Sequence, residues 1–338
     1  MSLAFLVYDL FLFFILPFIP KRGHHYQRLF LKAPHLHGKE TIWIHAVSVG
    51  EVKAFQPLYP LLKKQFPNAC FFLTCTTATG MKEAKRLYPE EVIFSYLPWD
   101  LSWIMRRFVR KISPRLLLLI EGDLWPNMLR FVHENRGKIA IVSAKLSFRS
   151  AKRYLFFRFL SKKLFSYIDL ILAKSQEHYD RFLPLVQRNR LQLVGNLKWD
   201  LPPAQTTPLP FTTPPLPIVT VASTHEGEEE LLLQHLPLDS LFLILAPRHP
   251  ERFHQVATLL KQRKIPFFRW SELSQRRGDE QLLLMDAFVE LPNCFVSSQL
   301  AIVAGSFIPG IGGHNLFEPC LYGAPVFFGP YAFSQKEL

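Results

Sequence analysis

Short apolar runs alternate with longer amphipathic stretches through two parts of the chain. Apolar runs bounded by turn residues predict buried strands, and the stretches between them predict helices. Continuous apolar strands separated by helices are typical of a parallel sheet that is covered on both faces. The pattern therefore predicts two α/β domains, one on each side of a proline-rich stretch at 201–217.

The predicted elements follow from these runs. Before the proline-rich stretch, strands are expected at 41–46, 70–74, 92–95, 116–120, 139–143 and 170–173, with helices at 52–66, 80–88, 101–111, 126–135, 154–166 and 176–186. After it, strands are expected at 218–222, 241–245, 266–269, 282–285, 300–303 and 325–328, with helices at 228–235 and 251–261 among them.

Residues 201–217 are expected to be a linker, because proline cannot donate to a sheet ladder and stiffens the chain. The linker separates a first domain over 22–200 from a second over 218–338. Two such domains joined by a hinge leave a cleft between them, and open α/β sheets bind ligands outside the carboxyl ends of their strands. Candidate functional residues are therefore sought directly after each apolar run.

Residues 1–21 form a separate apolar segment. Within 3–19 its apolar character is interrupted at Tyr8, Asp9 and Pro17, and basic residues follow directly. A cleaved signal peptide is disfavoured, because its positive charge would precede the apolar run. By the positive-inside rule, the basic residues would keep the rest of the chain on the cytoplasmic side. We therefore expect a single membrane anchor over 1–21, either spanning the bilayer or lying in its interface; a buried core helix is the alternative.

The amino-acid composition limits the class of protein and the kinds of partner that the chain can have. Hydrophobic residues make up 49% of the 338 residues, which excludes a disordered or collagen-like chain. The 40 Lys and Arg against 27 Asp and Glu give a net charge of +13, which favours phospholipid headgroups, nucleotides or nucleic acid as partners. Four scattered cysteines without a CxxC pair predict neither a disulfide framework nor a structural zinc site.

The turn after the first predicted strand carries Ser48, Gly50 and Glu51. Glu51 falls at the start of a predicted helix, where a carboxylate either complements the helix dipole or acts as a general base on a substrate hydroxyl. Ser48 lies in a segment that imitates the nucleophile elbow of serine hydrolases, although that elbow requires glycine where Ala46 stands.

The turns after the fourth and fifth predicted strands carry Glu121, Asp123 and Lys145. Carboxylates at a strand end can be metal ligands, acid and base groups, or helix caps. The chain contains neither Asp-x-Asp nor HExxH, so no metal site is expected. Lys145 supplies a cation beside hydroxyls, either for function or in a solvated loop.

Polar residues also follow the strands of the second domain. Ser223 and Thr224 lie in a hydroxyl-rich turn that suits an anion. Arg248 and His249 follow the next strand, where the arginine either binds a phosphate or pairs with Glu251 on the surface.

The densest cluster of candidates lies near the C-terminus and consists of Gly305, Ser306, Gly312, Gly313, Asn315 and Glu318. Glycines let the backbone approach a ligand closely, unless they serve packing alone. A helix expected to begin at the asparagine would direct its amides at a phosphate, and the glutamate could accept hydrogen bonds from a ribose. Neither a GxGxxG spacing nor a P-loop occurs.

Five segments, in this order along the chain, resemble one family. They are 45–51 (HAVSVGE), 124–127 (LWPN), 142–147 (VSAKLS), 246–253 (APRHPERF) and 312–318, which contains GGHN and a glutamate. Together they resemble the 3-deoxy-D-manno-octulosonic acid (Kdo) transferases of lipopolysaccharide and lipid A biosynthesis, and the abundance of phenylalanine is similar to that of chlamydial members. Because the family continues for several elements past 329–330, the resemblance also implies a C-terminally shortened chain with an incomplete second domain.

The resemblance implies two Rossmann-like domains facing a cleft, the GT-B type of glycosyltransferase. It implies an inverting reaction that moves Kdo from CMP-Kdo, bound by the second domain, to a lipid A precursor, bound by the first. The implied partners are CMP-Kdo, the lipid A precursor and the inner membrane, whose cytoplasmic face the enzyme would use. Nucleic acid, metal and other cofactors are not implied.

The resemblance also implies residue roles. Glu51 matches the family's general base, and Glu121 with Asp123 matches its second acidic motif. Ser48, Gly50 and Lys145 are expected on the acceptor side. The donor side is expected to include Arg248, Gly312, Gly313, Asn315 and Glu318, which match the nucleotide site, with the neighbouring Ser223, Thr224, His249, Gly305 and Ser306.

Two other functions stay open on the sequence. One is a catalytically inert, membrane-anchored remnant that binds anionic lipid; thermal stabilisation by CMP would distinguish a transferase from it. The other is a serine hydrolase with Ser48 as nucleophile, which a fluorophosphonate probe would label.

Overall fold

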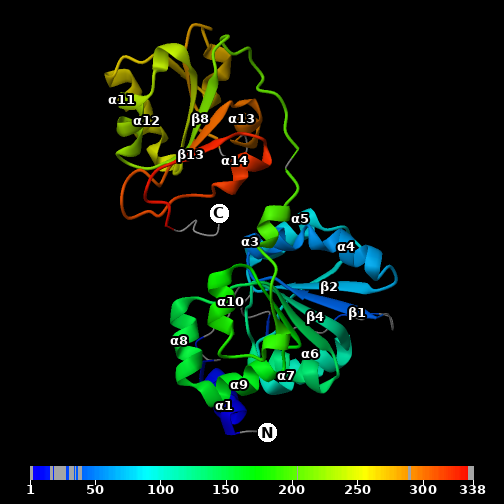
Figure 1. The fold of residues 1–338 in the computed structure, drawn as a ribbon. Coiled ribbons are helices and arrows are strands. Elements are labelled where there is room, and N and C mark those ends of the chain that lie inside the picture. The colour runs from blue at the N-terminus through cyan, green and yellow to red at the C-terminus, as the bar shows by residue number, and fades with distance from the viewer. Residues whose placement is uncertain are drawn as a thin grey trace. The chain divides into compact units, whose positions relative to one another are not determined.

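The computed structural model describes residues 3–15, 18, 28–29, 34, 36, 40–203, 205–287 and 291–333. Residue contacts divide the chain into two units, Met1–Leu201 and Pro202–Leu338 (Figure 1). Each unit contains one parallel sheet flanked by helices. The predicted fold class of two α/β domains is confirmed.

The first unit is built on a seven-stranded parallel sheet with the order β3-β2-β1-β4-β5-β6-β7. Its strands are β1 (Thr41–His45), β2 (Cys70–Cys75), β3 (Ile93–Tyr96), β4 (Pro114–Ile120), β5 (Lys138–Ala144), β6 (Leu170–Ala173) and β7 (Leu191–Leu193). The first six coincide with predicted strands. The prediction omits β7, because this short edge strand buries Leu191 alone and carries no apolar run.

Helices cover both faces of the first sheet (Figure 1). One face carries α3 (Val49–Phe55), α4 (Leu58–Gln65) and α5 (Ala78–Leu87); the other carries α6 (Ser102–Ile112), α7 (Pro126–Glu134), α8 (Phe148–Phe156), α9 (Arg158–Ser166) and α10 (Gln176–Phe182). Alternation along β1 serves both layers. Ile42 and Ile44 join the core under α3 and α5, whereas Trp43 packs against Phe108 of α6.

Two predictions of a single helix are wrong. The helix expected at 52–66 is divided into α3 and α4, because Pro57 lacks an N–H and starts a new helix as the N-cap of α4. The helix expected at 154–166 begins earlier, as α8, after Ser147 caps the Ser150 N–H. It is interrupted at Phe157, after which α9 begins.

The second unit is built on a six-stranded parallel sheet with the order β10-β11-β9-β8-β12-β13. Its strands are β8 (Ile218–Thr224), β9 (Phe242–Pro247), β10 (Phe267–Arg269), β11 (Leu282–Leu284), β12 (Leu300–Val303) and β13 (Val326–Phe328), and all six coincide with predicted strands. Its helices are α11 (Glu228–His235), α12 (Phe253–Gln262), α13 (Leu291–Ser297) and α14 (Phe317–Leu321).

The strand orders determine which turns are neighbours. In the first sheet, strands are added on one side of β1 up to β3 and on its other side from β4 onward; β8 and β12 form the same kind of reversal in the second sheet. Doubly wound sheets bind ligands at the carboxyl ends of the strands at such reversals. Glu51 lies in the first turn of α3, which follows β1, and Glu121 directly follows β4. Ser223 lies near the end of β8, and Gly305 follows β12.

Helix α1 (Leu3–Ile15) is attached to the first unit through its one charged residue. Asp9 accepts hydrogen bonds from the Ser102 N–H at 3.0 Å and the Asn127 side-chain amide at 2.9 Å. Among the described residues, no helix combines the length and apolar character needed to cross a membrane. The basic residues at 21 and 22, and the rest of 1–21 beyond 3–15 and 18, lie outside the described residues, so the anchor stays a prediction.

Candidate active site

The carboxyl end of the first sheet carries a pocket of about 420 Å³. Four residues predicted from the sequence line it: Glu51, Glu121, Asp123 and Lys145. A further part of the wall comes from α8 with its N-cap and from α10, through Ser147, Ser150, Tyr154, His178 and Phe182. The structure thus brings together predicted residues that lie up to 94 positions apart in the sequence, from position 51 to position 145.

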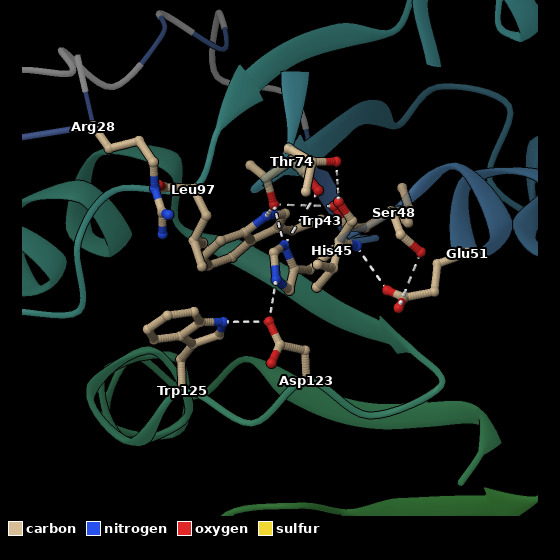
Figure 2. Close-up of polar contacts among 12 residues, drawn as sticks. Arg28, Trp43, His45, Ser48, Glu51, Thr74, Leu97, Asp123 and Trp125 are labelled. Carbon is tan, nitrogen blue, oxygen red and sulfur yellow. Dashed lines mark hydrogen bonds and ion pairs between the residues drawn. The ribbon is translucent and has the colours of Figure 1, made fainter. Parts of the chain in front are cut away.

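Glu51 lies in the first turn of α3, and its carboxylate folds back over the start of that helix (Figure 2). Oε2 accepts a hydrogen bond from the Val47 N–H at 2.7 Å, and Oε1 lies 3.4 Å from the Ser48 hydroxyl. Burial raises the pKa of Glu51 above its ordinary value, although the Val47 bond lowers it. The carboxylate therefore fixes the turn that leads into α3 and also has the raised proton affinity that suits a general base.

Gly50 and Ser48 complete the same turn. A Cβ at Gly50 would have Ser48 Oγ as its nearest neighbour, at 4.0 Å, so the start of α3 is uncrowded there. The side-chain partner that the structure gives Ser48 is Glu51. Both ring nitrogens of His45 are engaged by Thr74 and Asp123. The serine–histidine pair of a serine hydrolase is therefore not formed at this turn, among the residues that the structure describes.

A chain of hydrogen bonds holds Asp123 in place (Figure 2). Asp123 Oδ2 accepts from Trp125 Nε1 at 2.6 Å and lies 3.4 Å from His45 Nε2. Nδ1 of the buried His45 lies 3.0 Å from the Thr74 hydroxyl, which also accepts from Trp43 Nε1 at 2.9 Å. Although burial raises the pKa of Asp123, its partners bring it below the ordinary value. This geometry favours a positioning role, and the catalytic role expected for Asp123 stays a prediction.

Glu121, at the end of β4, is buried between two lysines. It forms ion pairs with Lys145 and with Lys198, whose Nζ lies 2.7 Å from Oε1. Burial raises the pKa of Glu121, but the hydrogen bonds from the two lysines outweigh it and hold the pKa below its ordinary value. A carboxylate paired in this way stays ionised, so we interpret Glu121 as the residue that holds Lys145 at the pocket. Its expected catalytic role stays a prediction.

In the second unit, a buried carboxylate that the sequence analysis did not identify joins two turns. Glu228 accepts hydrogen bonds from the N–H groups of His225 at 2.9 Å, Gly305 at 2.7 Å and Phe307 at 2.9 Å. Gly305 has a φ of +73°, and a Cβ there would lie 2.6 Å from the His314 ring, so glycine is required. Three consecutive glutamates at a helix start are typical of a solvated surface, which is why the sequence does not mark Glu228.

Three residues expected on the donor side are used within the fold. Thr224 is buried and donates to Glu229 at 2.6 Å, and Glu229 also forms two hydrogen bonds with Arg252. Ser306 is buried and bonds backbone groups at 2.7 and 2.9 Å. Ser223 turns the chain at the end of β8 with a φ of +62°. These side chains shape the turns after β8 and β12, and their contact with a donor stays a prediction.

Three histidines gather at the same end of the second sheet. The rings of His225 and His314 stack with their centroids 5.0 Å apart and their Nε2 atoms 2.7 Å apart, and His249 lies edge-on to His225 at 5.3 Å. Burial, His225 and the exposed Arg248 together lower the pKa of His314 to about 4. The sequence analysis identified His249 and Arg248 as candidates. It identified neither His225 nor His314, although His314 lies within a segment that carries the family resemblance.

The glycine-rich segment contacts this cluster, and the helix expected after it is present as a short helix. Gly312 and Gly313 have φ values of +96° and +86°, and the Gly313 N–H bonds the Gly305 carbonyl at 2.7 Å. Asn315 caps the following turn with its side-chain oxygen, and Glu318 lies in the first turn of α14. Helix α14 (Phe317–Leu321) begins two residues after Asn315, close to the expected start, and the phosphate site at its N-terminus stays a prediction.

Among the described residues, no three side chains of histidine, cysteine, aspartate or glutamate are arranged to hold a metal ion. That the reaction needs no metal or cofactor stays a prediction.

A chain of two units that each contain a parallel sheet also occurs among solved structures. The chain is similar to a crystal structure of a glycosyltransferase from Rickettsia africae, with a TM-score of 0.53 and 12% identity, covering 86% of this chain and 79% of that one. A likeness at this identity concerns the fold, which is that of GT-B glycosyltransferases. The C-terminal CMP-Kdo binding domain of WaaA from Acinetobacter baumannii is 37% identical over 36% of this chain and 65% of that one, with a TM-score of 0.33.

The relatives found by sequence identify the family, whereas the solved structures identify only the fold. Residues 20–201 match the family model of 3-deoxy-D-manno-octulosonic-acid transferase (kdotransferase). The chain is 35% identical to the 3-deoxy-D-manno-octulosonic acid transferase of Haemophilus influenzae, covering 88% of this chain and 73% of the relative. It is 31% identical to that of Chlamydia trachomatis, covering 88% and 72%. The chain belongs to this family of glycosyltransferases, the Kdo transferases, and the resemblance found in the sequence is confirmed.

Proposed function

We propose that this chain transfers Kdo from CMP-Kdo to a lipid A precursor by a single inverting displacement. An acceptor oxygen forms a bond to the anomeric carbon of Kdo while the bond from that carbon to the phosphate oxygen of CMP breaks. The proton of the acceptor hydroxyl passes to Glu51, which acts as the general base. Membership of the Kdo transferase family supports the transferred sugar and the class of reaction.

The position of Glu51 in the pocket carries the proposal. The carboxylate is nearly buried beside Lys145 and has a raised pKa, so it takes up a proton more readily than an exposed glutamate. Its Oε2 accepts the short bond from the Val47 N–H, whereas Oε1 has the longer contact with Ser48. Oε1 is therefore the atom that we propose takes the proton.

The cations of both units are proposed to bind the anionic parts of the substrates. Lys145, held by Glu121, would contact an anionic group of the acceptor within the pocket of the first unit. In the second unit, Arg248 and His249 would contact the phosphate of CMP, where negative charge grows as the bond breaks. In this proposal the acceptor occupies the first unit and the donor occupies the second.

Incubation of the chain with CMP-Kdo and a lipid A precursor, followed by mass spectrometry of the lipid, tests the proposal. We expect Glu51→Gln to reduce turnover about 100-fold or more, the usual scale for a positioned base, while CMP still raises the melting temperature. Glu90→Gln removes an exposed carboxylate of the same unit and should leave turnover unchanged. Near-normal turnover of Glu51→Gln would exclude Glu51 as the base. If the unaltered chain shows neither transfer nor stabilisation by CMP, the inert lipid-binding alternative is favoured.

We further propose that the reaction takes place at the cytoplasmic face of the inner membrane, with 1–21 as the anchor. Helix α1 exposes Phe11, Phe13 and Phe14, while Asp9 attaches it to the first unit. A helix fixed in this way supports attachment in the membrane interface, where an apolar side enters the acyl boundary.

A further inference from the structure

Two polar residues near the middle of the otherwise apolar helix α1 attach this helix to the first unit. Asp9 Oδ1 accepts hydrogen bonds from the Ser102 N–H at 3.0 Å and from the Asn127 side-chain amide at 2.9 Å. The Tyr8 hydroxyl donates to Asp100 Oδ2 at 3.1 Å. Tyr8, Asp9 and Asp100 are called the α1 clamp below.

Apolar contacts hold α1 on either side of the α1 clamp. Phe5 and Leu12 are both buried. Phe5 packs edge-on against Tyr167 with ring centroids 6.3 Å apart, and Leu12 forms a small apolar cluster with Leu101 and Ile104 at the start of α6. Helix α1 is therefore packed as a part of the first unit, and its polar residues contact the N-terminal ends of α6 and α7.

Asp100 is the fully buried member of the α1 clamp, and it holds the first turn of α7. Its Oδ2 accepts from the Asn127 N–H and its Oδ1 from the Met128 N–H, both at 2.8 Å. Its backbone carbonyl accepts from the Asn127 side-chain amide at 2.6 Å. The first N–H groups of a helix have no partner within the helix, and the N-cap residue Trp125 supplies no side-chain bond. Helix α7 therefore depends on Asp100 for its cap.

Trp125 connects the first turn of α7 to the pocket. It is the N-cap residue of this helix and directly precedes Pro126, the first helical residue. Its Nε1 donates to Asp123 Oδ2 at 2.6 Å, and Asp123 lines the pocket together with Glu51 (Figure 2). A displaced first turn of α7 would therefore move the Trp125 ring, and Asp123 would lose the hydrogen bond that holds it.

A buried arginine also contacts the ring of Trp125. The guanidinium carbon of Arg28 lies 5.7 Å from the centroid of the Trp125 ring and 5.0 Å from that of Trp99. Its Nε donates to the Leu97 carbonyl at 2.6 Å (Figure 2). Trp125 thus has a cation against its ring and a carboxylate at its N–H, so its position is narrowly defined once α7 is fixed.

We propose that Tyr8, Asp9 and Asp100 are positioning residues for the active site. They fix the first turn of α7, this turn fixes Trp125, and Trp125 holds Asp123 in the pocket wall. Helix α1, whose segment the sequence predicts to be an anchor, thus also determines the geometry of the pocket. The coupling to Trp125 stands on the contacts above, whereas its effect on transfer rests on the proposed function.

The indole N–H signals of the full chain, recorded by NMR with isotope-labelled tryptophan, test the coupling. The chain has six tryptophans, and the signal that is missing in Trp125→Phe identifies Trp125. We expect Asp9→Ala to shift this signal, because the Ser102 N–H and the Asn127 amide lose their acceptor. Leu10→Ala, at an exposed position of the same helix, is the matched control and should leave the signal in place. Asp9→Asn keeps an acceptor oxygen and should restore the original position.

The signal of Trp43 separates displacement from unfolding. Trp43 is fully buried in β1, so its signal should keep its intensity in Asp9→Ala as long as the first unit stays folded. If Asp9→Ala loses this intensity, Tyr8→Phe answers the same question, because it removes only the hydroxyl that bonds Asp100. We expect Tyr8→Phe to shift the Trp125 signal as well.

Transfer of Kdo to a detergent-dispersed acceptor tests the effect on the reaction. We expect Asp9→Ala to lower kcat about ten-fold, because a small misplacement that originates far from the reacting atoms is costly for turnover. The KM for CMP-Kdo should stay unchanged, because the donor is proposed to occupy the second unit. Leu10→Ala should keep the kcat of the unaltered chain.

Three outcomes would overturn the proposal: an unmoved Trp125 signal in both Asp9→Ala and Tyr8→Phe, an equal shift in Leu10→Ala, or a shifted signal with unchanged kcat. A chain whose Trp125 signal shifts as expected, but whose unaltered form transfers no Kdo, contradicts the proposed function alone and leaves the coupling in place.

Discussion

Replacing Glu228 with alanine would remove the acceptor that joins two turns of the second unit. Its carboxylate takes three backbone hydrogen bonds: one from His225, after β8, and two from Gly305 and Phe307, after β12. The side chain is fully buried, so water has no direct access to these N–H groups. In Glu228→Ala all three are therefore left without an acceptor.

The size of the effect follows from these three bonds. A buried N–H without a partner costs about 1–3 kcal/mol, so three of them give about 3 kcal/mol even at the lower figure. The variant also no longer buries a carboxylate, which offsets part of this loss. We expect the free energy of unfolding of the second unit to fall by about 2–3 kcal/mol, a large share of the roughly 5–15 kcal/mol of a typical domain. At a urea slope of about 2 kcal/mol per M, the midpoint falls by about 1 M or more.

Hydrogen exchange at increasing urea concentration measures this loss in each unit separately. Peptides from β8 and β12 should lose protection in Glu228→Ala, whereas peptides from β1 and β4 should exchange as in the unaltered chain. Glu226→Gln, two positions earlier at an exposed residue, is the matched control. A decrease of less than about 1 kcal/mol in the free energy of unfolding of Glu228→Ala would refute the reasoning, and so would an equal decrease in the control.

Three further changes test other parts of the two sites. Gly305→Ala should lower the melting temperature more than Gly227→Ala, because both glycines have a positive φ but only a Cβ at Gly305 has atoms within 4 Å; equal melting temperatures would contradict this. Thr74→Val should lower the free energy of unfolding by about 2 kcal/mol, because Nε1–H of the buried Trp43 loses its acceptor, and urea titration with tryptophan fluorescence measures the change. The rate of Kdo transfer should rise with pH through the pKa of Glu51, which burial raises, because only the ionised carboxylate accepts a proton; the residual activity of Glu51→Gln should lack this acidic limb.

Elements were predictable where a local pattern suffices. The strands predicted at 170–173 and 300–303 agree with β6 and β12 residue by residue, because a continuous apolar run indicates a buried strand whatever its neighbours are. Pro126 begins α7 as expected, since the first position of a helix requires no N–H.

The boundary between α8 and α9 was not predictable for a physical reason. Exposed phenylalanines at 156, 157 and 159 lie close behind Ala151 and Tyr154, the inward-facing residues of α8, with Arg158 among them. A helix with apolar residues on two sides has no clear period, so the interruption at Phe157 is hidden in the sequence.

The sequence by itself determined that Glu51 and Glu121 follow apolar strands and that glycines crowd the segment from 305 to 313. Only the tertiary structure decided that β1 and β4 are neighbours, which brings the two carboxylates to one pocket. It also decided that Lys198 reaches Glu121, whereas Glu51 is bonded by its own turn. The reason is that buried parallel strands carry nearly interchangeable apolar runs, so the sequence does not state their order. The partners and pKa of a side chain depend on distances in space that this order sets.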